Sequence, residues 1–208
     1  MSTREIPIRP VNLGGGQAGQ LPREGRAWSV PAHTYQTGML MALAAIVMMF
    51  AAFTSAMVVR KGLADDWVGT TLPRILYLNT LVLVASSVTL ELSRRALSKG
   101  AKGFSLWLYA TQALGLAFLA GQLTAWQELA ERGVYLSSNP SSSFFYLLTG
   151  AHGLHLLGGL AALGYAAAKA PRIAAGLKKR TAVDVAALYW HFMDGLWIYL
   201  LMLFVVRL

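Results

Sequence analysis

The chain has no cysteine and few charges, and each shortage excludes a class of protein. Without cysteine there are neither disulfide bonds, nor thiolate metal ligands, nor a cysteine nucleophile. Charged residues make up only 13% of the 208 residues, whereas 56% are hydrophobic. This balance is typical of a membrane protein with several spans and not of a soluble domain. The length allows one domain.

The start of the chain lacks an apolar core directly after a short basic segment. It therefore does not resemble a signal peptide, and we expect it to be retained. Residues 1–35 hold several prolines, the run Gly14-Gly15-Gly16 and no long apolar block, which predicts a flexible tail. The glycines follow no strand and open no helix, so they do not indicate a nucleotide site.

Five long apolar segments follow the tail. A helix of about 20 residues crosses a hydrocarbon core about 30 Å thick. We expect spans at about residues 36–59, 73–92, 104–127, 143–168 and 183–206. The sequence thus predicts an all-α, polytopic membrane protein: a tail at 1–35 and a five-helix transmembrane bundle at 36–208.

The lysines and arginines are unevenly spread over the loops. If the N-terminus is cytoplasmic, 13 of the 18 lie on inner segments. The positive-inside rule then predicts a cytoplasmic N-terminus and an outer C-terminus. This distribution argues against a nucleic-acid partner. The basic clusters primarily set topology and also suit anionic lipid headgroups; the candidate headgroup ligands are Arg94, Arg95, Lys178, Lys179 and Arg180.

The fourth segment, SFFYLLTGAHGLHLLGGL at 143–160, carries His152 and His155 with several glycines beside them. Residues three apart share a helix face, and glycines allow a neighbouring helix to approach closely. An ionisable group at membrane depth marks a candidate functional site. Polar residues in bundles also serve to hold helices together, and we favour that structural interpretation for both histidines.

The fifth segment places His191 and Asp194 three residues apart in YWHFMDGLW. An aspartate one helical turn from a histidine can accept its ring hydrogen. Because the fourth and fifth spans run antiparallel, His152 or His155 can lie at a similar depth. We therefore expect one buried polar cluster joining these two helices.

Glu91 lies near the end of the second span. A carboxylate there can pair with Arg94 or Arg95 one turn away, or it can handle protons; the sequence favours neither. Three imidazoles and a carboxylate would suffice chemically for zinc, copper or iron. Histidines spread over two helices are more often hydrogen-bonding residues, so we expect no metal site in this chain.

Four stretches, in order, resemble one family. SFFYLLTGAHGLHLLGGLAAL at 143–163 closely resembles a signature helix of subunit III of haem-copper cytochrome c oxidases. ALYWHFMDGLWIYL at 187–200 is similar to that family's closing helix, and LNTLVLVASSVTLELSRRAL at 78–97 to an earlier one. In LGLAFLAGQLTAWQEL, Gln122 stands at the family's glutamine. The resemblance covers about residues 72–206.

The resemblance implies a subunit without haem or copper of its own. Such subunits pack on the catalytic subunit I, bind phospholipid in a cleft and support proton uptake and durability; haem and copper are expected in partner subunits. With five spans, the chain looks like the short bacterial form. That form is also found in quinol oxidases and in proteins associated with nitric oxide reductases.

The chain departs from the family in two places. Many members carry an acidic residue in the helix that corresponds to the first span, where this chain reads ALAAIVMMFAAF. A family role that depends on that carboxylate is therefore not transferred to this chain. The family's Glu-Tyr pair after the glutamine is replaced by Ala125-Trp126. Glu91 stands at neither position.

The sequence thus predicts a non-catalytic subunit III of a proton-pumping terminal oxidase in the bacterial inner membrane, with subunits I and II and phospholipid as partners. The buried polar contacts are assigned to His152, His155, His191, Asp194, Glu91 and Gln122. One alternative keeps the fold within a quinol oxidase or nitric oxide reductase assembly. Another is an independent proton-coupled transporter, against which the absence of repeated halves argues.

Overall fold

The computed structural model describes residues 32–63, 67, 69, 71–99, 103–169, 173 and 181–207. These residues hold five helices long and apolar enough to cross a membrane, and no strand. The helices are α1 (Ala32–Leu63), α2 (Ile75–Ser98), α3 (Phe104–Glu131), α4 (Pro140–Ala168) and α6 (Thr181–Arg207). The expected all-α fold with five spans is confirmed. The orientation of the termini stays a prediction.

Every helix is longer than the span expected from hydropathy. The 28 residues of α3 extend about 42 Å at 1.5 Å per residue, compared with a hydrocarbon core of about 30 Å. The additional turns therefore reach the polar interfacial regions. α1 begins at Ala32, so the last residues of the expected tail are helical, and the rest of the tail lies outside the described residues.

Side-chain and backbone caps define the turn between α3 and α4. Gly133 follows α3 with φ of 76°, a conformation that favours glycine. Its N–H donates to Ala130 O and the Val134 N–H to Leu129 O, the two bonds of a Schellman motif. Asn139 then caps α4: its side chain accepts from the Ser142 N–H, and Ser142 Oγ accepts from the Asn139 N–H. The helix consequently starts at Pro140, before the apolar run begins.

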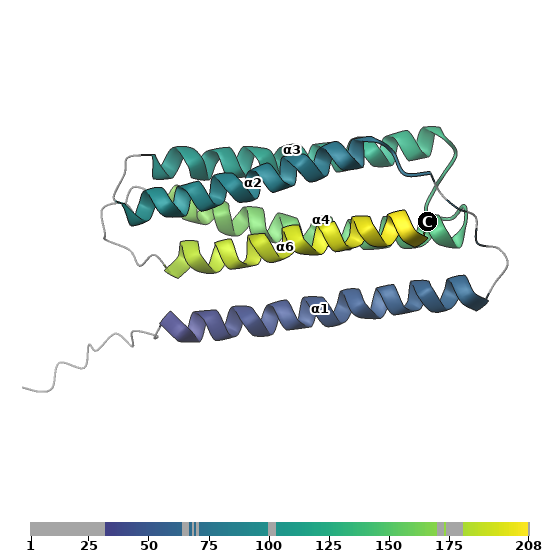
Figure 1. Cartoon of the computed structure of the whole chain (residues 1–208), viewed down its shortest axis with the longest axis horizontal. Helices are drawn as coiled ribbons and strands as arrows, with labels where there is room; N and C mark the ends of the chain where they lie inside the picture. Colours follow the sequence, from purple (N-terminus) through teal and green to yellow (C-terminus); the bar gives the residue numbers. More distant parts are fainter. Residues whose placement is uncertain are drawn as a thin grey trace, which may run out of the picture. The chain divides into compact units, whose positions relative to one another are not determined.

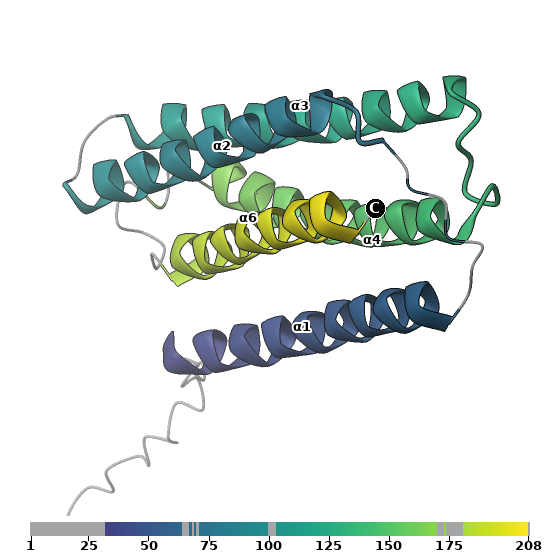
Figure 2. The same cartoon turned by 45° about the vertical axis from the view of Figure 1, so that its right-hand side comes forward.

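Successive helices run antiparallel in up-and-down order (Figure 1). α2 packs most extensively on α3, while α6 packs on both α2 and α4, and α3 on α4. α1 packs against α4 and α6 and lies on the side of them away from α2 and α3 in both views (Figures 1 and 2). The core is therefore formed by α2, α3, α4 and α6, with α1 along one side.

Aromatic side chains fill the centre of this bundle. Trp190 and Trp197 of α6 and Phe118 of α3 are fully buried. Space for Trp190 depends on Gly115 of α3, where an added Cβ would lie 2.7 Å from Trp190 Cη2. Lipid tails are as apolar as these side chains, so close packing and hydrogen bonds, rather than escape from water, hold the helices together.

Candidate functional site

Two tryptophans of α6 donate hydrogen bonds to hydroxyl groups of α2. The distance from Trp190 Nε1 to Ser86 Oγ is 2.9 Å, and that from Trp197 Nε1 to Thr80 Oγ1 is 3.0 Å. The tryptophans are two helical turns apart and so share one face of α6. These bonds anchor α6 on α2 at two depths.

Ser87 of α2, the residue after Ser86, contacts both polar residues of the YWHFMD stretch. Its Oγ lies 2.8 Å from His191 Nδ1 and donates a hydrogen bond to Asp194 Oδ2. A serine has one hydroxyl proton, so donation to the carboxylate leaves Oγ free to accept from His191 Nδ1–H in that tautomer. Asp194 is buried, and its Oδ1 has no hydrogen-bond partner among the described residues.

These contacts form a series of polar links between α2 and α6. We call it the α2–α6 seam, and its members are Thr80, Ser86 and Ser87 of α2 and Trp190, His191, Asp194 and Trp197 of α6. Hydrogen bonds between side chains dominate it, which makes it a specific helix-helix contact within the membrane domain.

An ion-pair cluster continues the seam at one end of α2 and α6. Arg94 lies 3.1 Å from Glu91 and 3.1 Å from Asp184 of α6, and Arg95 lies 3.0 Å from Glu91. The pairing of Glu91 with neighbouring arginines, one of the two alternatives that the sequence left open, is present. Because two carboxylates balance two guanidinium groups, Arg94 and Arg95 offer little net charge to a lipid headgroup. Lys178, Lys179 and Arg180 lie outside the described residues.

A second buried polar pair lies between α3 and α4. The His152 side chain is fully buried, and its ring centroid is 5.1 Å from that of Trp197 and 6.0 Å from that of Phe118. Gln122 is 3% exposed. Both ring nitrogens of His152 and both amide atoms of Gln122 lack a hydrogen-bond partner in the described part of the chain.

Neighbouring contacts place Gln122 and His152 at the same depth. Phe118, one turn before Gln122, contacts the His152 ring. Trp126, one turn after Gln122, donates from Nε1 to Thr149 Oγ1 at 3.2 Å, and Thr149 lies one turn before His152. Gln122 thus faces the His152 level of α4. We call the contact made by these five residues the α3–α4 seam.

His155 is half-buried and turns toward other neighbours. Its Nδ1 lies 2.7 Å from Ala151 O of its own helix. Its backbone carbonyl accepts a hydrogen bond of 2.8 Å from the Tyr189 hydroxyl of α6, and its ring centroid is 5.9 Å from that of Phe50 of α1. His155 is therefore part of the contact of α4 with α1 and α6.

The structure groups these residues differently from the expected cluster between the fourth and fifth spans. His191 and Asp194 contact Ser87 of α2, whereas His152 lies among the rings of Phe118 and Trp197. The physical reason is the rotation of α6 about its axis, which turns the His191 and Asp194 face toward α2. No group of three or more histidine, aspartate or glutamate side chains able to hold a metal ion occurs among the described residues.

Sequence reasoning did not single out the α2 hydroxyl groups or Asp184 as partners. A weak signal was present in the spacing: Thr80 and Ser86, which accept from the indoles, are six residues apart, and Trp190 and Trp197 are seven residues apart. Two hydroxyls and two indoles at similar intervals are compatible with two antiparallel faces that pair at both ends.

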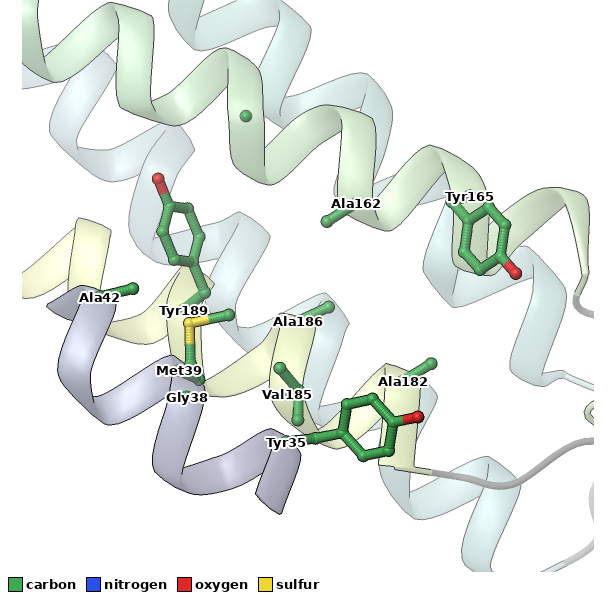
Figure 3. A pocket seen from close by; sticks show the side chains of 11 residues that line it. Tyr35, Gly38, Met39, Ala42, Ala162, Tyr165, Ala182, Val185, Ala186 and Tyr189 are labelled. Carbon is green, nitrogen blue, oxygen red and sulfur yellow. The ribbon is translucent and has the colours of Figure 1, made fainter. Parts of the chain in front are cut away.

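A cavity of about 930 Å³ lies between α1 and parts of α4 and α6 (Figure 3). Its lining carries no charged side chain and is mostly small or apolar: Tyr35, Gly38, Met39, Ala42, Gly158, Ala162, Tyr165, Ala182, Val185, Ala186 and Tyr189. The Tyr189 hydroxyl is already bonded to His155 O. This lining suits an apolar chain better than a polar metabolite.

Comparison with known proteins identifies the family. The model of the cytochrome c oxidase subunit III family matches residues 27–206, which include nearly all of the five helices. The chain belongs to the cytochrome c oxidase subunit III family. The four stretches that resemble this family thus lie within a match that extends through α1 as well.

Two relatives show how far the similarity reaches. The chain is 33% identical over 168 residues to cytochrome c oxidase subunit 3 of Thermostichus vulcanus, covering 78% of this chain and 82% of that protein. It is 38% identical over 120 residues to a probable cytochrome c oxidase subunit 3 of Nocardia farcinica, covering 57% of this chain and 59% of that protein. This subunit III family member is a multi-pass membrane protein.

Proposed function

We propose that the protein is the non-catalytic subunit III of a proton-pumping haem-copper terminal oxidase, which oxidises cytochrome c and reduces oxygen to water in aerobic respiration. The family match over residues 27–206 carries the proposal. Subunit I is the catalytic partner and subunit II a further partner, and these hold the haem and copper. The chain stabilises subunit I and supports proton uptake. The polar side chains that lie between packed helices support a scaffold role.

Bound phospholipid is part of this proposal. The uncharged cavity beside α1 is large enough for part of an acyl chain, and it lies within the membrane-spanning helices. Lys178, Lys179 and Arg180, which directly precede α6 in the sequence, are the proposed ligands of the anionic headgroup. Arg94 and Arg95 contribute less, because Glu91 and Asp184 already neutralise them.

The orientation follows from the distribution of positive charge. We place the protein in a bacterial cytoplasmic membrane, with the residues before α1 in the cytoplasm and the C-terminus outside. A phosphatase reporter fused after Leu208, active only outside the cytoplasm, should be active. A reporter active only in the cytoplasm, fused at the same position, serves as the matched control, and its activity would reverse the assignment.

The deciding experiment is purification through an affinity tag on this chain in mild detergent. We expect large partner subunits to co-purify and a reduced-minus-oxidised visible spectrum to show haem bands. The haem type and the activity with cytochrome c or quinol then distinguish a cytochrome c oxidase from a quinol oxidase. A colourless chain that purifies alone after gentle extraction would contradict the proposal and favour an independent transporter.

A further inference from the structure

The α3–α4 seam holds an unusual concentration of buried polar atoms without protein partners. Gln122 and His152 are 3% and 0% exposed, and all four of their side-chain nitrogen and oxygen atoms lack a hydrogen-bond partner in the described residues. Buried polar groups in native proteins are almost always paired with protein or with ordered water. Two such side chains at one depth on facing helices therefore indicate a shared ligand.

The chemistry of the two side chains restricts that ligand. A carboxamide offers two donors and an acceptor, and a neutral imidazole offers one donor and one acceptor. Neither residue brings a charge, and the described residues contain no group of three metal-ligating side chains. A ligand that both donates and accepts, and that is small enough to fit between packed helices, matches this set. Water has these properties.

The surface of α4 beside His152 has space for a methyl-sized group at two positions. Glycines flank His152 on α4, and an added Cβ would lie 3.7 Å from Trp126 at Gly150 and 4.0 Å from Leu119 at Gly153. At Gly115 of α3, by contrast, the nearest atom would be 2.7 Å away. The helix surface beside His152 is thus less tightly packed than the surface around Trp190.

We propose that Gln122 and His152 form a buried hydration site between α3 and α4, occupied by at least one water molecule that bridges the amide and the imidazole. Phe118 and Trp197 cover the histidine ring, so this water is separated from the lipid. The site gives the α3–α4 contact a polar link equivalent to the direct hydrogen bonds of the α2–α6 seam. This inference goes beyond the proposed function, because the hydration site does not depend on which complex the subunit joins.

Water-edited solid-state NMR on the full chain, purified with its partners and reconstituted in lipid bilayers, tests the site. The chain has only four histidines, so ¹⁵N-histidine labelling gives few ring signals, and His152→Phe assigns one of them. We expect magnetisation to pass from water to the His152 ring N–H in the unaltered chain. Absence of that transfer would overturn the proposal.

Two variants of Gln122 distinguish a bridging water from a direct contact between the amide and the imidazole. Gln122→Met removes the amide at similar length and should abolish the transfer from water to His152, whereas Gln122→Asn keeps an amide and should retain it. His155→Phe, outside the seam, is the matched control and should leave the His152 signal unchanged. A direct contact between the Gln122 amide and the His152 ring, with no water signal, would contradict the site, as would transfer that survives Gln122→Met.

Discussion

The α2–α6 seam and the α3–α4 seam both bury polar side chains, but only the first pairs most of them within the protein. In the α2–α6 seam, indole and hydroxyl groups form direct hydrogen bonds such as Trp190 to Ser86 and Trp197 to Thr80. In the α3–α4 seam, Gln122 and His152 have no partner among the described residues. Two polar contacts in one bundle can thus be satisfied by different means, one by matched side chains and one by a proposed water.

The largest loss of stability is expected when Trp190, one of the two tryptophans of the α2–α6 seam, is replaced. Trp190→Ala removes a fully buried indole and its bond to Ser86. It should lower the free energy of unfolding by about 3–5 kcal/mol, because neighbours only partly fill the cavity. Denaturation in mixed micelles with increasing sodium dodecyl sulfate measures this. Trp107→Ala, at a tryptophan 37% exposed, is the control, and an equal loss there would contradict the assignment.

A smaller loss is expected at Gly115 of α3, which packs against Trp190 of the α2–α6 seam. A Cβ there would lie 2.7 Å from Trp190 Cη2 and 2.9 Å from Leu160 Cδ2. Gly115→Ala should therefore cost about 1–3 kcal/mol through overpacking. Gly195→Ala, where an added Cβ has no atom within 4 Å, should be neutral or stabilising in the same denaturation assay. If Gly115→Ala leaves the free energy of unfolding unchanged, α3 can move away from Trp190.

The contrast between the seams is tested by removing polar groups from each. Ser87→Ala leaves both carboxylate oxygens of Asp194 without a described partner and should cost about 1–3 kcal/mol. The double variant Gln122→Met/His152→Phe removes the two polar side chains of the other seam that have no partner among the described residues, at similar volume. It should cost less, since replacing both partners by apolar groups of similar shape is nearly neutral. If the double variant is less stable than Ser87→Ala, the proposed contrast between the seams is wrong.

The smallest effect is expected at the ion-pair cluster. Arg94→Gln breaks the contacts with Glu91 and Asp184, whose side chains are 37% and 45% exposed. Exposed ion pairs contribute about 0–1 kcal/mol and weaken with salt. The loss should therefore be below about 1 kcal/mol and should shrink further as ionic strength rises. Arg132→Gln, which breaks an exposed pair with Glu128 at the C-terminal end of α3, should cause a similarly small, salt-dependent loss. A large, salt-independent loss at Arg94 would indicate a buried role.

Particular residues show how much of the site the sequence could predict. The pairing of Glu91 with Arg94 and Arg95 was predictable because all three lie within one turn of one helix. The Ser87–Asp194 bond was not, since it joins residues 107 positions apart on different helices. The start of α4 at Pro140 was also missed, because the Asn139 cap extends the helix beyond its apolar run.

The sequence by itself determined the five spans, their order, their approximate limits and the family. The length and hydropathy of each segment are local properties, and they decide whether that segment can cross a bilayer. Only the tertiary structure decided which faces meet. The rotation of each helix about its axis is set by packing against its neighbours. Because of that rotation, His191 and Asp194 contact Ser87 of α2, whereas His152 lies against the rings of Phe118 and Trp197.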